Sequence, residues 1–283
     1  MKSGSEPDFP EREASTGNRA LTPISGTVHL VGAGPGAADL LTVRAVRLLG
    51  EADIVFHDAL IGPEILCLAT KGEKVAVGKR CGKHSTAQHF INKRLLDAAR
   101  RYRVVVRLKG GDPMLFGRAH EEISFLKANS VKVEIVPGIT AALAAAAEHG
   151  VSLTQRGVSR SVVFATPRVA EGARPSGWAK SVAAADTAVL YMAANDASLV
   201  KEVLIKEGMR ADTPVAIAES VSSPQSALHA GTLADLPELA KGLKGGPALM
   251  LVGELFAALQ RQPERIAEQR AKPAQRPLGN RQA

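Results

Sequence analysis

The segment Val28–Asp39, which reads VHLVGAGPGAAD, places the tightest constraint on how this chain can fold. A short apolar run ends at Val31, and glycine or proline then fills four of the next five positions. A stretch with the periodicity of a helix follows at Leu40–Leu49. A strand that stops at glycines leaves backbone N–H groups exposed, with no Cβ to keep a ligand away. We therefore expect a strand, a loop that can accept a ligand, and a helix, in that order.

Short β-rich runs alternate with helical patterns from Thr27 to Val136. Strands separated by helices form βαβ units, which assemble into a mainly parallel sheet. The expected strands are Val28–Val31, Ile54–Phe56, Lys74–Val77, Val104–Leu108 and Val133–Val136, and helices are expected around Leu40–Leu49, Glu64–Leu68, Gln88–Arg100 and Ala119–Ala128.

The pattern changes near Pro137, where we place a domain boundary. An alanine-rich helix is expected at Thr140–Glu148, and a turn followed by a capped helix at Gly231–Leu236. Further strands are expected at Ser161–Ala165, Thr187–Met192, Val215–Ala218 and Ala248–Val252, with helices around Leu199–Lys206 and Leu236–Leu243. The sequence thus predicts an α/β protein with domains at 27–137 and 138–258, a disordered leader at 1–26 and a basic disordered tail at 259–283.

Half of the net charge of +8 lies in the last residues of the chain. Residues 260–283 contain six lysines and arginines against two glutamates, a balance of +4. A basic tail rich in Gln and Pro is typically solvated and disordered. No aromatic residues are interleaved for stacking on bases, which disfavours nucleic acid as a partner. The remaining excess suits an acidic substrate.

Composition and cysteine content bear on where the protein is expected to reside and on whether it binds a metal. The longest apolar stretches, such as Ile139–Ala147, are far shorter than the roughly 20 residues of a membrane helix. Cys67 and Cys81 are too few for a disulfide framework and lack zinc-type spacing. Met1–Ala20 does not read as a secretory signal. We expect a cytoplasmic protein with no membrane partner and no metal.

The first glycine loop resembles a dinucleotide fingerprint only in part. That fingerprint is G-x-G-x-x-G with an acidic residue about 20 positions later. Here the spacing is G-x-G-x-G, although Asp53 and Asp58 lie at a suitable distance. Pro35 removes a donor N–H where a pyrophosphate needs one. The loop favours a cofactor without phosphates over NAD, and an ordinary strand-to-helix turn explains the glycines equally well.

A second glycine loop follows the expected strand that ends at Leu108, at Gly110-Gly111-Asp112-Pro113. Asp112 either offers a carboxylate to a ribose or amino group, or caps the next helix. Ligands in open α/β sheets gather at the carboxyl ends of strands, so two such loops favour a binding site. Thr140 has a similar pair of interpretations, as a helix cap or a ligand contact. Met192, by its place alone, is more often a core residue.

Five motifs now appear in a familiar order between Thr27 and Leu255: VGAGPG, VGKRCGKHS, RLKGGDPMLFGR, VPGITAA, and PVAIAE followed by GTL. Together they resemble the uroporphyrinogen-III C-methyltransferases, which belong to the S-adenosylmethionine-dependent tetrapyrrole methyltransferases. The resemblance implies two α/β domains with S-adenosylmethionine in the cleft between them, and a homodimer. It also implies methylation of uroporphyrinogen III at C2 and C7 to precorrin-2, for sirohaem or cobalamin biosynthesis.

The resemblance also implies roles for individual residues. Asp58 becomes the proton acceptor and Lys79 the proton donor, while Arg118 and Glu121 match the substrate pocket. Uroporphyrinogen carries eight carboxylates, so the neighbouring cations Arg80 and Lys83 are chemically sensible partners too. The implied cofactor contacts are Pro35, Gly110, Gly111, Asp112, Leu115, Thr140, Ala141, Met192, Ala216 and Ala248.

This chain departs from the family pattern on the substrate side. Where the family has Tyr-Asp-Arg-Leu, the sequence reads His57-Asp58-Ala59-Leu60, and Ala119-His120 replaces two glycines. Thr166-Pro167-Arg168 stands in place of Thr-Gly-His, and Ala193 in place of the glycine after Met192. The cofactor loops are intact, so these departures bear on substrate and rate more than on cofactor binding.

Two other functions fit the same motifs. One is methylation of a later precorrin, against which the uroporphyrinogen-type VGKRCGKHS motif argues. The other is a degenerate paralogue that binds S-adenosylmethionine or a tetrapyrrole without turnover, which Ala59 and His120 favour. An NAD-dependent oxidoreductase is disfavoured by the glycine spacing and by Pro35.

Overall fold

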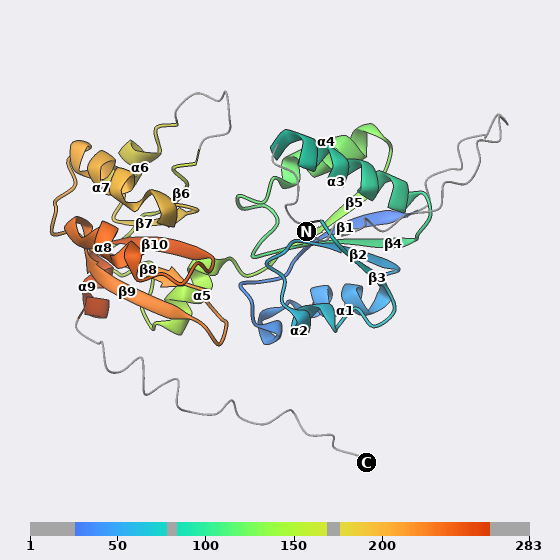
Figure 1. Ribbon diagram of the computed structural model, residues 1–283, viewed down its shortest axis with the longest axis horizontal. Helices are drawn as coiled ribbons and strands as arrows, with labels where there is room; N and C mark the ends of the chain where they lie inside the picture. Colours follow the sequence, from blue (N-terminus) through green and yellow to red (C-terminus); the bar gives the residue numbers. More distant parts are fainter. Residues whose placement is uncertain (1–25, 78–83, 169–175, 261–283) are drawn as a thin grey trace, which may run out of the picture.

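The computed structural model describes residues 26–77, 84–168 and 176–260. These residues form two lobes, each built on one five-stranded sheet (Figure 1). The expected boundary at Pro137 falls between the last strand of the first sheet and the first helix of the second lobe. The prediction of an α/β protein with two sheets is therefore confirmed.

The first sheet has the strand order β3-β2-β4-β1-β5, and every pairing in it is parallel. Helices α1 and α2 pack on one face of the sheet, and α3 and α4 on the other (Figure 1). The strands are β1 (Thr27–Gly32), β2 (Ile54–His57), β3 (Glu73–Ala76), β4 (Val104–Lys109) and β5 (Lys132–Val136), and the helices are α1 (Val43–Glu51), α2 (Pro63–Leu66), α3 (His84–Ala99) and α4 (Ala119–Ala128).

Strand β4 lies in the middle of this sheet and is buried on both faces. Side chains alternate along a strand, so Val106 and Leu108 face the core under α1 and α2, while Val105 faces α3 and α4. Arg107 and Lys109 share the face of Val105 by the same alternation. Two cations thus enter a layer that is mainly apolar, and they need partners there.

The second sheet has the order β6-β7-β10-β8-β9, with one parallel pair, β6 and β7, and antiparallel pairings elsewhere. Helices α6, α7 and α8 cover one face, and α5 and α9 the other. The strands are β6 (Val162–Ala165), β7 (Thr187–Tyr191), β8 (Pro214–Glu219), β9 (Ala227–Thr232) and β10 (Ala248–Gly253), and the helices are α5 (Ala141–Glu148), α6 (Trp178–Ala184), α7 (Ala197–Lys206), α8 (Leu236–Lys241) and α9 (Ala257–Gln260).

Three elements of the second lobe were not predicted: β9, α6 and the short helix α9. Strand β9 reads ALHAGT and is half-buried along its length, so it shows neither an apolar run nor a clear alternation. It forms the edge of the sheet, pairing only with β8. Helix α6 is also short, with two buried residues. The expected capped helix near Gly231 is present, since Thr232 and Asp235 form a capping box before α8.

The described part of the chain contains no helix with the length and hydropathy needed to cross a membrane. It also contains no group of three or more His, Cys, Asp or Glu side chains able to hold a metal ion.

Candidate functional site

The two glycine loops predicted at strand ends are joined to each other. The N–H of Gly111 donates to the carbonyl of Gly34 at 2.7 Å, and the N–H of Gly34 donates to that of Gly111 at 3.2 Å. Both residues have φ near +70°, at 70° for Gly34 and 65° for Gly111, where glycine is strongly favoured. Loops that follow β1 and β4 therefore form one continuous backbone surface at the carboxyl edge of the first sheet.

A third loop, between β5 and α5, packs against this pair through Gly138. A Cβ on Gly32 would lie 2.6 Å from the Cα of Gly138, and a Cβ on Gly138 would lie 2.8 Å from the Cα of Gly32. The second of these would also overlap the carbonyl oxygen of Gly111. Real Cβ atoms do not approach backbone so closely, so Gly32 and Gly138 must both lack a side chain for the loops to meet.

Asp112 holds these loops in register. Its Oδ2 accepts the N–H of Gly138 at 2.9 Å, and its Oδ1 accepts the N–H of Met114 at 2.7 Å. Helix α4 begins only at Ala119, so the prediction that Asp112 caps the next helix is wrong. The carboxylate instead closes its own turn and ties it to the third loop. Its contact with a cofactor stays a prediction.

The first loop also reaches the second lobe. A Cβ on Gly36 would lie 3.4 Å from the carbonyl oxygen of Val221, which follows β8. The neighbouring Ser222 donates its N–H to Oε2 of Glu148 at 2.8 Å, at the end of α5. The loop that contains Pro35 thus lies where the two lobes meet.

Tyr191, at the end of β7, connects several of these segments. Its hydroxyl lies 2.6 Å from Oγ1 of Thr140 and accepts the N–H of Ala142 at 3.2 Å. Its ring centroid is 5.1 Å from that of Phe116, which belongs to the loop after β4 in the other lobe. Burial raises the pKa of the Tyr191 hydroxyl, against the smaller effect of its hydrogen bonds. Thr140 occupies the N-cap position of α5, as predicted, but its side chain makes no capping hydrogen bond.

Tyr191→Phe is expected to lower the free energy of unfolding by about 1–3 kcal/mol, because the buried N–H of Ala142 loses its acceptor. Urea denaturation followed by circular dichroism measures this. The other tyrosine provides the control, since the Tyr102 hydroxyl has no hydrogen bond within the described residues and Tyr102→Phe should change little. Equal effects of the two substitutions would contradict the role of Tyr191.

Met192 follows Tyr191 with a positive φ of 56° and is 42% exposed. The interpretation of Met192 as a core residue is therefore wrong, and its contact with a cofactor stays a prediction. Leu115 and Ala141 are half-buried, in the loop after β4 and at the first position of α5.

The remaining predicted cofactor contacts lie in strands of the second sheet. Tyr191 pairs with Leu249, which pairs in turn with Ala218. In this register Ala248 lies beside the carboxyl end of β7. Ala216 is buried and lies two residues before Ala218 in β8. Their cofactor contacts likewise stay predictions.

Asp58, the predicted proton acceptor, lies directly after β2 and forms an ion pair with Arg107 of β4. Nη2 of Arg107 lies 2.6 Å from Oδ1 of Asp58, and the two side chains are 3% and 33% exposed. The backbone carbonyl of Asp58 lies 3.1 Å from Nδ1 of His57. The buried arginine therefore holds a carboxylate that reaches the surface.

Glu122 of α4 is the centre of the buried cluster behind this pair. Its carboxylate is fully buried and receives Nε of Arg107, Nζ of Lys109 and Nε2 of Gln88, all at 3.2 Å. Burial, helped by Arg107, lowers the pKa of Lys109, and Glu122 opposes that shift. Arg107, Lys109 and Glu122 were not predicted, although charges at alternate positions of an apolar strand were a signal for such a cluster.

Arg118 and Glu121 form a second, exposed pair at the start of α4. Nε and Nη2 of Arg118 each lie 2.7 Å from one oxygen of Glu121, in the parallel arrangement typical of Arg–carboxylate pairs. The hydrogen bond from Arg118 lowers the pKa of Glu121. His120 is exposed, but Ala119 is 4% exposed in the core under α3 and α4, so only His120 adds bulk to the surface.

Asp53, which has a suitable spacing for a ribose contact, lies at the opposite end of the sheet from the glycine loops. There its Oδ2 accepts the N–H groups of Arg103 and Val104 at 3.0 and 2.9 Å. It therefore cannot serve a ribose at the loops. The predicted proton donor Lys79, with Arg80 and Lys83, lies outside the described residues.

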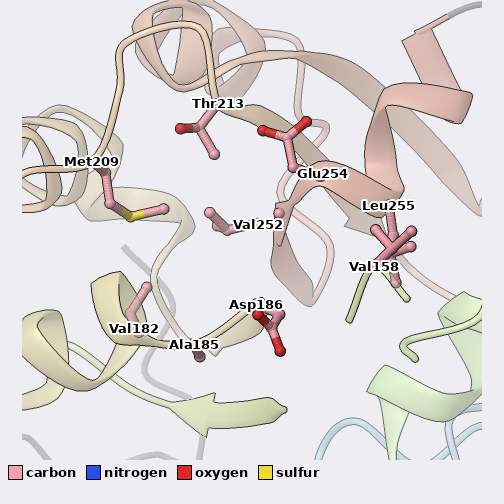
Figure 2. Close-up of a pocket in the computed structure, with 10 residues that line it drawn as sticks. Val158, Val182, Ala185, Asp186, Met209, Thr213, Val252, Glu254 and Leu255 are labelled. Carbon is pink, nitrogen blue, oxygen red and sulfur yellow. The ribbon is translucent and has the colours of Figure 1, made fainter. Parts of the chain in front are cut away.

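A partly open cavity of about 210 Å³ lies within the second lobe, away from these loops (Figure 2). Its lining is mainly apolar, with Asp186 and Glu254 at its edge. Asp186 already accepts the N–H groups of Arg160 and Ser161 and the hydroxyl of Ser161. No lysine or arginine lines the cavity, so it does not suit an anionic tetrapyrrole.

Fold and site together define a class of protein: two α/β lobes that bind a small molecule against bare backbone where they meet. The dinucleotide fingerprint is not complete in it. The chain belongs to the family of tetrapyrrole (corrin/porphyrin) methylases, which its residues 27–237 match. The predicted family is thereby confirmed.

Individual relatives support this placement. A siroheme synthase from Pseudomonas fluorescens (strain Pf0-1) is 45% identical over 82% of this chain and 50% of that protein. One from Zymomonas mobilis is 44% identical over the same shares. The chain therefore spans about half the length of these curated relatives.

Solved structures give the same result for the fold. Uroporphyrin-III C-methyltransferase from Thermus thermophilus, complexed with S-adenosyl homocysteine, matches with a TM-score of 0.73 at 38% identity. The match covers 82% of this chain and 100% of that one. A cobalt precorrin-4 methyltransferase matches with a TM-score of 0.72 at 27% identity, covering 81% and 95%. The fold is that of tetrapyrrole methyltransferases.

Proposed function

We propose that this chain methylates uroporphyrinogen III at C2 and C7 to give precorrin-2, with S-adenosylmethionine as the methyl donor. One observation carries the proposal: three glycine loops are hydrogen-bonded and packed into a single backbone surface at the strand ends. A relative with the same fold and 38% identity has been crystallised with S-adenosyl homocysteine. Identity is higher to the uroporphyrin-III enzyme than to the precorrin-4 enzyme.

The loops fit such a cofactor on steric grounds. A Cβ on Gly110 would meet no atom within 4 Å, so open space lies against bare backbone there. Gly111 and Asp112 belong to the same loop, and the Cα of Thr140 lies 3.8 Å from where a Cβ on Gly111 would be. We assign Pro35 and Met192 as further contacts, as the family resemblance implies. When bound, S-adenosylmethionine supplies an electrophilic methyl group. The loops contribute mainly by holding the two reactants in line, which removes much of the entropic barrier.

The side chains across the site bind the substrate carboxylates and accept the proton that the macrocycle loses after methylation. Methylation of a neutral pyrrole carbon leaves the macrocycle positively charged, and loss of a ring-system proton restores neutrality. Asp58 accepts that proton at the oxygen that Arg107 does not hold. The Arg118 guanidinium pairs with carboxylates of the substrate, and Lys79 donates a proton, as the family resemblance implies. We further propose a cytoplasmic homodimer with no nucleic-acid or membrane partner.

The test is anaerobic incubation with uroporphyrinogen III and methyl-labelled S-adenosylmethionine. We expect two labelled methyl groups per tetrapyrrole. Asp58→Asn should lower kcat by about 10²- to 10⁴-fold, the usual contribution of a general base, and leave binding of S-adenosyl homocysteine unchanged. Asp97→Asn is the control, because Asp97 is an exposed carboxylate on α3 whose ion pair with Arg100 measures 3.6 Å.

Two results would contradict the proposal. Binding of S-adenosyl homocysteine without any labelled product would instead indicate a paralogue that has lost catalysis. Label entering a later precorrin, but not uroporphyrinogen III, would identify the alternative substrate.

A further inference from the structure

We propose that Arg107 is a positioning residue for Asp58, fixing which carboxylate oxygen faces the macrocycle. This inference rests on the proposed function for the identity of the substrate. The contact that it names is between two residues 49 positions apart in the chain, brought together because β2 and β4 are neighbours in the sheet.

Arg107 is held rigidly enough to act in this way. Its side chain is 3% exposed. Nε donates to Oε1 of Glu122 at 3.2 Å, and Nη1 donates to the carbonyl of Leu108 at 3.1 Å. These two bonds fix the plane of the guanidinium, and Nη2 donates within it to Oδ1 of Asp58 at 2.6 Å.

Asp58 is the more exposed member of the pair. Its side chain is 33% exposed and follows the last residue of β2. Within the described ranges, Arg107 is the only side chain that holds its carboxylate, so without Arg107 the carboxylate can rotate freely. The bond to Oδ1 therefore assigns Oδ2 to the substrate side.

Charge balance supports the same assignment. Arg107 and Lys109 carry two positive charges, and Asp58 and Glu122 carry two negative ones, so the cluster is neutral as a unit. When Oδ2 takes the proton from the methylated macrocycle, the electrons of the broken C–H bond return to the ring system. Arg107 stays in place, held by Glu122, while Asp58 changes charge. The arginine thus keeps the acceptor in one orientation through the cycle.

A double-mutant cycle tests the inference. Arg107→Gln is expected to lower kcat about 10- to 100-fold with little change in KM, the order of loss expected when a reacting group is misplaced by about 1 Å. In the Asp58→Asn background the same substitution should change kcat by less than about threefold, because residues that act through one another are not additive. An equal factor in both backgrounds would show a purely structural role and overturn the inference.

Gln88→Met is the matched control, since Gln88 also donates to Glu122 at 3.2 Å but is not in contact with Asp58. Gln88→Met should disturb the cluster, but its effect on kcat should be the same with and without Asp58→Asn. A loss of kcat equal to that of Arg107→Gln would overturn the inference. If Arg107→Gln does not fold, Arg107→Lys takes its place, because a lysine keeps the charge but lacks the planar fork that fixes the direction of the hydrogen bond to Asp58.

A crystallographic readout separates this inference from the proposed function. Both the wild type and the Arg107 variant are crystallised with S-adenosyl homocysteine. The wild type should show one Asp58 rotamer, and the variant should show several. One unchanged rotamer in both would overturn the positioning role, whatever the activity. A wild type without methylated product would overturn the proposed function, and the rotamers would still decide the role of Arg107.

Discussion

Glu122→Ala should lower the free energy of unfolding by about 3–5 kcal/mol, the usual cost of removing one partner from a buried ion pair. The substitution leaves Arg107 and Lys109 buried with one carboxylate between them. It also removes one of the two acceptors of Gln88, which keeps its hydrogen bond to Oδ1 of Asn92 at 3.0 Å. Urea denaturation at neutral pH measures the loss, with tryptophan fluorescence or circular dichroism as the signal.

The neighbouring glutamate is a control of identical chemistry. Glu121 pairs with Arg118 at 2.7 Å, but its side chain is 48% exposed, whereas that of Glu122 is fully buried. Exposed pairs contribute at most about 1 kcal/mol, so Glu121→Ala should have a small effect on stability. Similar losses for the two variants would show that the buried cluster does not stabilise the fold as described.

Gly138→Ala should have the largest effect on ligand binding. The new Cβ would overlap the carbonyl of Gly111 and press on Gly32, so the three loops must separate. We expect binding of S-adenosyl homocysteine to weaken by about 100-fold or more, since displacements near 1 Å have effects of this size. Isothermal titration calorimetry measures the affinity, and thermal unfolding should show a concurrent loss of about 1–3 kcal/mol from overpacking.

Two other glycines separate steric from ligand effects. A Cβ on Gly62, before α2, meets nothing within 4 Å, so Gly62→Ala should change neither stability nor affinity. Gly110→Ala is equally free of clashes, yet it should weaken binding, because the ligand would occupy that space. Wild-type affinity in Gly138→Ala would contradict the packing of the loops.

Much of the first lobe could be predicted because its signals are local. Each expected strand overlaps an observed one, and α4 has the predicted bounds, Ala119–Ala128. Runs of Val, Ile and Leu bounded by glycine carry this information within a few residues. Strand β9 lacked such a signal, since its Ala, His and Gly become a strand only by pairing with β8.

The glycine loops could be predicted from the sequence, because a glycine has no side chain wherever it lies. The hydrogen-bond partners of the polar side chains could not be predicted, because they lie far away in the sequence. Asp112 and Thr140 were singled out from the sequence, but the hydrogen bonds that tie them to other segments go to Gly138 and Tyr191, far away in sequence. Asp53 had suitable spacing for a ribose and lies at the wrong end of the sheet. Spacing along the chain does not tell which end of a strand a residue occupies in space.

The sequence by itself determined the family, through its ordered motifs, and the two-lobed α/β fold, through the alternation of apolar runs and helical patterns. It also determined the backbone-lined loops, because a glycine lacks a Cβ in every context. Only the tertiary structure decided which charges are buried and with whom. Arg107 reads as one more charge in RLKGGDP, and it becomes the partner of Asp58 because β4 lies beside β2. A buried charge must find a counter-charge within a few ångströms, and the order of strands in the sheet selects that partner.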